Sequence, residues 1–181
     1  MASGNEVTNQ IYLSSNAFIS SQRHDTTKGL HKTWMRNSTN TIDTTVFNTL
    51  SPSLKITPTS VSTSPYKAVS APDGRGFKVC VADGQTCTPS VYVRMSKAST
   101  GDAADYSGSQ PRLILKRNDA MGYTADQVID TGTAAIGNWE QLTGAVTGAA
   151  TDDGVLEFVV DCDYGTANSF INVDDFTASV A

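Results

Sequence analysis

Residues 155–163 read VLEFVVDCD, and the alternation in this stretch decides the fold class. Its even-numbered positions are all apolar, whereas three of its five odd-numbered positions are acidic. Successive side chains of a β-strand point to opposite faces, so one face of this strand belongs in a core and the other mostly in water. We therefore expect Leu156, Phe158 and Val160 to point inward, with Cys162 as a small core residue on the same face.

The last strand, residues 170–178, has the same alternation with its phase broken. Apolar residues occupy odd positions up to Val173 and even positions from Phe176 onward. Both groups can face one core only if an extra residue lies between them. The pattern therefore predicts a β-bulge at Asp174-Asp175.

Asp174 is a charged residue inside a strand, where it needs a partner. Its carboxylate could accept backbone N–H bonds at the bulge. It could instead bind Ca²⁺, which prefers several oxygen ligands. Both alternatives are open from the sequence.

Outward from these two strands, short apolar segments follow one another and are separated by turn dipeptides such as Asp83-Gly84 and Asp153-Gly154. Many short strands at this spacing are typical of an antiparallel sandwich or barrel. Only 17% of the residues are charged, which is too few for the solvent-exposed faces of long helices. We expect almost no helix, and strands at 53–57, 66–70, 77–82, 90–95, 112–117, 127–130, 139–146, 155–163 and 170–178.

The composition excludes several classes of function. The 181 residues fit one domain with its own core. The net charge of -5 and the scattered basic residues are unsuited to a phosphate backbone, so we expect no nucleic-acid partner. No apolar run approaches the length of a membrane span, and MASGNE at residues 1–6 lacks the features of a signal peptide. We expect the chain to stay in a cytoplasm unless it leaves with a larger assembly.

The first 50 residues differ from the rest, because polar Ser, Thr and Asn tracts surround isolated apolar residues. We expect residues 1–30 to form an extended arm and residues 31–181 to form the sandwich. The arm has too many apolar side chains for plain disorder, so it needs a surface, either its own domain or a neighbouring subunit. Its candidate partner-binding residues are Ile11, Leu13, Phe18 and Ile19.

The sequence contains no recognisable catalytic constellation. His24 and His31 are the only histidines, and both lie in the polar amino-terminal region. The sequence has no nucleophile elbow and no pair of His or Cys residues with the spacing of zinc ligands. It also has no Gly-rich loop that leads from a strand into a helix. We expect no enzyme activity and no cofactor, apart from a structural Ca²⁺ if Asp174 follows its second alternative.

Cys80 and Cys87 flank Asp83-Gly84. If this dipeptide is a two-residue hairpin turn, the two cysteines face each other across paired strands and the geometry allows a bridge. In a cytoplasmic product, reduced thiols are favoured.

Aromatic side chains are the other candidates for a ligand platform. Trp139 follows Gly137-Asn138 and opens an apolar strand, which favours a core or sheet-edge role. Tyr106 and Tyr123 fall in predicted loops and are the better candidates for exposed rings that face a glycan.

Three ordered segments resemble jelly-roll carbohydrate-binding modules and galactose-binding-like domains: CTPSVYVR at 87–94, NWEQLTG at 138–144 and NVDDF at 172–176. With SGSQPRLILK at 107–116 and DGVLEFVVDCD at 153–163, the chain is similar to jelly-roll domains in structural proteins of tailed bacteriophages. The resemblance implies an all-β, antiparallel two-sheet jelly-roll sandwich. It also implies a structural Ca²⁺ at the first Asp of the terminal pair, here Asp174.

Two functions follow from this resemblance. The first is a non-enzymatic virion structural protein, a small capsid decoration protein that binds the major capsid protein as a trimer. The second is a carbohydrate-binding module, free or within a phage receptor-binding fibre, with a glycan as its partner. An enzyme on the same fold, such as a polysaccharide lyase or a glycosidase, is the least favoured.

Overall fold

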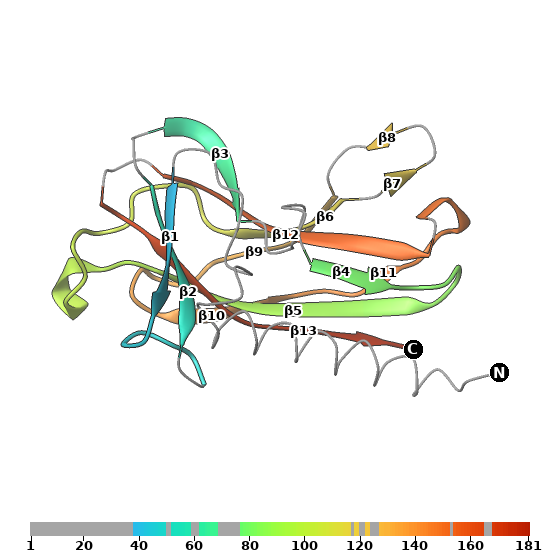
Figure 1. The fold of residues 1–181 in the computed structure, drawn as a ribbon, viewed down its shortest axis with the longest axis horizontal. Coiled ribbons are helices and arrows are strands. Elements are labelled where there is room, and N and C mark those ends of the chain that lie inside the picture. The colour runs from blue at the N-terminus through green and yellow to red at the C-terminus, as the bar shows by residue number, and fades with distance from the viewer. Residues whose placement is uncertain are drawn as a thin grey trace.

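Two antiparallel sheets lie face to face in the computed structural model (Figure 1). It describes residues 38–49, 52–58, 62–68, 77–116, 118–119, 122–123, 127–152, 154–164 and 168–181. The predicted arm, with Ile11, Leu13, Phe18 and Ile19, lies outside these ranges and stays a prediction. His24 and His31 lie outside them as well.

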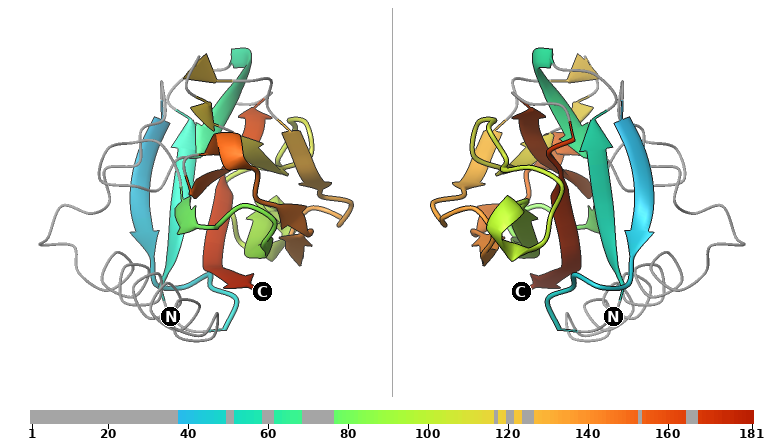
Figure 2. Two further views of the ribbon diagram at one scale, coloured as in Figure 1. Left: turned by 90° about the vertical axis from the view of Figure 1, so that its right-hand side faces the viewer. Right: turned by 90° about the vertical axis from the view of Figure 1, so that its left-hand side faces the viewer.

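Sheet A has six strands, in the order β1-β2-β13-β5-β10, with β11 also paired to β5. Figure 2 shows β1, β2 and β13 side by side at one end of this sheet. The bounds are β1 Ser38–Asp43, β2 Ser53–Pro58, β5 Thr86–Met95, β10 Trp139–Thr143, β11 Val146–Thr147 and β13 Ile171–Val180.

Sheet B has five strands, in the order β3-β12-β6-β9, with β4 also paired to β12. A short pair, β7 and β8, stands apart from both sheets. The bounds are β3 Ser62–Ala68, β4 Phe77–Cys80, β6 Arg112–Lys116, β7 Asn118–Asp119, β8 Gly122–Tyr123, β9 Gln127–Thr131 and β12 Val155–Tyr164.

Helix is limited, in the described ranges, to the 3-10 turns η1 Ala98–Thr100 and η2 Ala150–Asp152. The predicted two-sheet sandwich with almost no helix is confirmed for these residues. None of their helices is long and apolar enough to cross a membrane.

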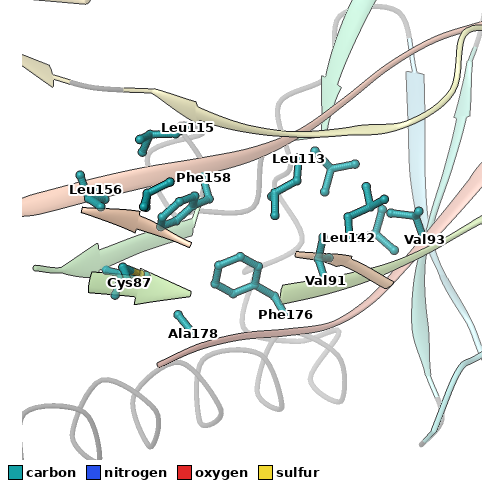
Figure 3. Close-up of a cluster of buried hydrophobic side chains, with 14 of the residues drawn as sticks. Cys87, Val91, Val93, Leu113, Leu115, Leu142, Leu156, Phe158, Phe176 and Ala178 are labelled. Atoms are coloured by element: carbon teal, nitrogen blue, oxygen red, sulfur yellow. The ribbon is translucent and has the colours of Figure 1, made fainter. Parts of the chain in front are cut away.

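The core lies between the inner faces of the two sheets (Figure 3). Leu156, Phe158 and Val160 are fully buried in it, as the alternation predicts. The rings of Phe158 and Phe176 meet across the sandwich with their centroids 6.4 Å apart. Burying each large side chain of this kind contributes about 1.5–3 kcal/mol, so this cluster is the main source of stability.

The other face of β12 is less wet than expected. Val159 is fully buried and Glu157 is 6% exposed. The prediction of a mostly solvated outer face is therefore wrong at these two positions. Alternation identifies which residues share a face, but it does not reveal what covers that face.

The bulge in β13 is confirmed. Asp174 lies opposite Tyr92 and Thr177 lies opposite Ser90, so three steps along β13 match two steps along β5. The extra residue restores the phase, and both Val173 and Phe176 face the core. Asp175 has a φ of 50°, a left-handed conformation that is uncommon for residues other than glycine.

The Asp83-Gly84 turn joins the two sheets and does not form a hairpin. β4 belongs to sheet B and β5 to sheet A, so Cys80 and Cys87 do not sit on paired strands. Both thiols are free, Cys80 at the surface and Cys87 in the core. Burial raises the pKa of the Cys87 thiol to about 12, so this thiol stays protonated at neutral pH.

Candidate ligand-binding face

The outer face of sheet A carries the side chains that alternate with the core residues. On β5, Val91 and Val93 face the core, so Tyr92 and Arg94 point outward. Because Gln141 of β10 lies opposite Tyr92, it belongs to the same outer face.

Trp139 of β10 joins this row of outward residues, because its register partner is Arg94. It is half-buried and stands outside the core cluster, at the edge of the sheet. The predicted sheet-edge role is therefore the one found, and the core role is not. Tyr92 is also half-buried, whereas Gln141 is exposed and its amide donates a 2.6 Å hydrogen bond to Ser90.

A cluster of buried polar residues around Arg94 stabilises one side of this outer face. The guanidinium of Arg94 forms a 2.7 Å ion pair with Asp102, and both side chains are only 6% exposed. Arg94 also donates from Nε to the carbonyl of Gly137 at 3.1 Å and from Nη2 to the hydroxyl of Thr100 at 2.9 Å. A single cation thus fastens the 97–105 loop and the turn before Trp139 to the sheet.

Asn172, the second residue of β13, connects this cluster to β1 and β2 on the other side of the sheet. Its amide donates to Asp43 Oδ2 at 3.2 Å and to Ser53 Oγ at 3.0 Å, while its carbonyl oxygen lies 3.5 Å from Arg94 Nη1. Asn172 is fully buried, so each of these bonds replaces one that water would otherwise make.

Asp43 is held as a carboxylate. Burial raises the pKa of this carboxyl, but hydrogen bonds from Thr45, Val46 and Asn172 outweigh burial and hold the pKa below its usual value. The ionised form is the one that accepts these bonds, so the cluster depends on the charge of Asp43.

The oxygens of Asp174 accept backbone N–H bonds, as the first of its two predicted alternatives requires. Oδ1 accepts from Asp175 and Oδ2 from Asn48, each at 2.9 Å. Each carboxylate oxygen has two lone pairs, so these bonds leave acceptor sites on Asp174, and the Ca²⁺ alternative stays a prediction. In the ranges that the structure describes, no group of three or more His, Cys, Asp or Glu is placed to hold a metal ion.

The two tyrosines predicted to be exposed do not join this face. Tyr106 is 5% exposed and packs in the core cluster, with its hydroxyl donating to the carbonyl of Ser109 at 2.8 Å. The expectation of an exposed Tyr106 is wrong, because a loop residue can still turn inward when its polar end finds a partner. Tyr123 lies in β8 opposite Asn118, and its side chain is outside the described part of the chain.

Sequence reasoning considered Trp139 but did not identify the face that it shares with Tyr92 and Gln141. The alternation of Tyr92 and Arg94 with Val91 and Val93 could have indicated two residues of this face. It could not indicate that Gln141 pairs with Tyr92, because strand order is not written in either segment.

Neither a protein-family model nor a curated protein matches the chain. Solved structures do. The CBM22-1 xylan-binding domain of Paenibacillus barcinonensis Xyn10C has a TM-score of 0.54 at 12% identity, over 81% of this chain and 84% of that domain. The C-terminal family 22 carbohydrate-binding module of Clostridium thermocellum Xyn10B has a TM-score of 0.56 at 15% identity, over 81% of this chain and 82% of that one.

The enzymatically active domain of tailspike protein 4 from bacteriophage CBA120 is also similar. Its TM-score is 0.51 at 10% identity, over 80% of this chain and 18% of the tailspike chain. At such identities the likeness concerns the fold alone. The chain therefore has the jelly-roll β-sandwich fold found in family 22 carbohydrate-binding modules.

Proposed function

We propose that this chain is a non-catalytic carbohydrate-binding module whose ligand lies on the outer face of sheet A. The observation that carries the proposal is the group formed by Trp139, Tyr92 and Gln141 on two neighbouring strands. Two partly exposed aromatic rings beside an exposed amide offer apolar surface to the faces of sugar rings and hydrogen bonds to their hydroxyls. The structural likeness to xylan-binding modules supports the same function.

Charge favours a neutral glycan. Arg94 is neutralised by Asp102, and the ammonium of Lys55 lies 3.8 Å from the centroid of the buried Phe170 ring. The groups that remain for a ligand on β5 and β10 are aromatic rings, hydroxyls and an amide. The net charge of -5 also disfavours an acidic polysaccharide.

The test is calorimetric titration with neutral xylan, glucan and mannan oligosaccharides and with acidic polygalacturonate oligosaccharides. We expect binding to a neutral series and none to the acidic one. Trp139→Ala and Tyr92→Ala should each weaken it at least about tenfold, equivalent to about 1.4 kcal/mol. Val128→Ala is the control, because it removes an exposed apolar side chain from sheet B. If no neutral glycan binds, or if the Trp139 and Tyr92 variants bind like wild type, the proposal fails.

A virion structural role is the second candidate, and the likeness to a phage tailspike domain favours it. In this case the chain would be a trimeric capsid decoration protein, or part of a fibre, and residues 1–30 would attach it to the major capsid protein or another virion protein. Deletion of residues 1–20 should then leave a folded domain that occupies capsids poorly. Normal occupancy by the folded, truncated chain would show that the arm is not the attachment device, and failure of the full chain to bind capsids would contradict the virion role.

A further inference from the structure

Residues 44–49, the first part of the connection between β1 and β2, are fixed to the outer face of sheet A. Its first residues fold back on Asp43, whose Oδ1 accepts from Thr45 N at 2.9 Å, Thr45 Oγ1 at 2.7 Å and Val46 N at 3.0 Å. The carbonyl of Val46 in turn accepts a 2.6 Å hydrogen bond from Ser53. At the start of this loop, both N–H and O–H donors and a carbonyl acceptor are therefore hydrogen-bonded.

Residues 48 and 49 of the same loop are held by the bulge of β13. Asn48 donates its backbone N–H to Asp174 at 2.9 Å and its side-chain amide to Asp175 at 3.2 Å. Thr49 donates its hydroxyl to Asp175 as well. Two carboxylates from the last strand thus hold a loop that is more than 120 residues away in sequence.

This arrangement is costly. Asp174 is 3% exposed, and burying a carboxylate is unfavourable unless hydrogen bonds replace water. Asp175 adopts a left-handed conformation, which is strained for a residue with a Cβ. The hydrogen bonds that fix this short loop therefore require both a buried carboxylate and a strained backbone.

Phe47 stands between the two anchored residues Val46 and Asn48, and its side chain is 38% exposed. In the described ranges, Phe47 and Val128 are the large hydrophobic residues that stay exposed. A single exposed apolar side chain is ordinary in itself. Phe47 differs because its loop is fastened beside the candidate ligand-binding face.

The register places this loop next to the aromatic group. Gln141 lies opposite Tyr92, and Tyr92 lies opposite Asp174, which binds Asn48. Neighbouring strands are about 4.8 Å apart, so the step from β10 to β13 covers roughly 10 Å across the sheet. The loop therefore continues the row that begins at β10, in the direction across the strands.

We propose that Phe47 is a further ligand-contact residue, which extends the glycan site across sheet A beyond Tyr92, and that Asp174 and Asp175 are positioning residues that fix its loop. This inference rests on the proposed carbohydrate binding. It specifies the ligand as an oligosaccharide that runs across the strands and is long enough to reach from β10 to the 44–49 loop. A short oligosaccharide would occupy the Trp139 and Tyr92 end alone.

The test compares short with long ligands. Wild type, Phe47→Ala and Trp139→Ala are titrated with the three-unit and six-unit members of the xylan, glucan and mannan series. We expect Phe47→Ala to weaken binding of the six-unit ligand at least about fivefold and that of the three-unit ligand less than twofold. Phe47→Trp should retain the six-unit affinity, because it keeps a ring at this position.

The positioning role predicts the same signature for Asp174→Asn. An amide has one acceptor oxygen where the carboxylate uses two, so the variant cannot accept from both Asn48 of the loop and Asp175 of the bulge. We expect selective loss of six-unit affinity. A purely structural role would weaken both ligands in proportion, together with the melting temperature.

The outcomes separate this inference from the proposed function. If Trp139→Ala abolishes binding and Phe47→Ala leaves the six-unit affinity unchanged, the extension is wrong and the proposed function stands. If Phe47→Ala weakens both lengths equally, the extension is also wrong. If wild type binds no neutral oligosaccharide of either length, both the proposed function and this inference fail.

Discussion

Along β13, the two faces of sheet A are buried to a similar degree by opposite chemistry. On β13, Ile171 and Val173 enter an apolar core, whereas Asn172 and Asp174 on the reverse face are equally inaccessible but entirely polar. The inner face is stabilised by area removed from water, which has no preferred direction. The outer face is stabilised by hydrogen bonds that require particular partners at particular angles.

This difference determines which amino-acid substitutions each face tolerates. An apolar core tolerates other hydrophobic side chains of similar volume. A buried polar network is stable only while every member has its partner, so a single substitution leaves unpaired groups behind. On this sheet the network holds the 97–105 and 44–49 loops.

The largest effect on stability is expected in the apolar core between the two sheets. Phe158→Ala removes a fully buried ring from the centre of the core and should lower the free energy of unfolding by about 3–5 kcal/mol. Urea denaturation of wild type and variant measures it. Val128→Ala, at an exposed position, should change stability by less than about 0.5 kcal/mol. A loss below about 1 kcal/mol for Phe158→Ala would show that the strand phase is reversed.

A smaller loss of stability is expected in the polar network on the outer face of sheet A. Asp102→Asn leaves the buried Arg94 guanidinium without its counterion and should cost about 1–3 kcal/mol. Asp105→Asn is the matched control, because Asp105 lies on the same loop and accepts one exposed hydrogen bond from Ala98. Equal losses for the two variants would mean that loop anchoring, and not the buried charge, determines the cost.

The two faces also differ in how well the sequence predicts them. Phe158 and the bulge at Asp174-Asp175 follow from the period of two within a few residues, and the structure confirms both. The bond between Asn48 and Asp174 joins residues 126 positions apart, and no local pattern specifies such a pair. The Asp83-Gly84 dipeptide does not distinguish a hairpin from a connection between sheets, because it occurs in both kinds of turn.

Acid should weaken the outer side selectively through Asp43. The pKa of this carboxyl is lower in the folded protein than in an unfolded chain, where it is about 3.9. Its contribution is therefore complete above about pH 5 and is lost as the pH falls through the lower, folded value. Denaturation of wild type and Asp43→Asn between pH 7 and pH 2.5 measures this. The gap between their stabilities should narrow below about pH 4, and a constant gap would contradict the prediction.

The smallest effect is expected at Asp175, where conformation and charge can be separated. Asparagine adopts the left-handed region readily, and its side-chain oxygen can still accept from Asn48 and Thr49. Asp175→Asn should therefore change the free energy of unfolding by less than about 0.5 kcal/mol. Asp175→Val, which is β-branched and has no acceptor, should lose about 1–2 kcal/mol from backbone strain alone. If Asp175→Asn instead costs as much as Asp175→Val, the bulge requires negative charge, as a bound cation would. A melting temperature that falls with EDTA and recovers with Ca²⁺ would then identify that cation and overturn the hydrogen-bonding role assigned to this pair of carboxylates.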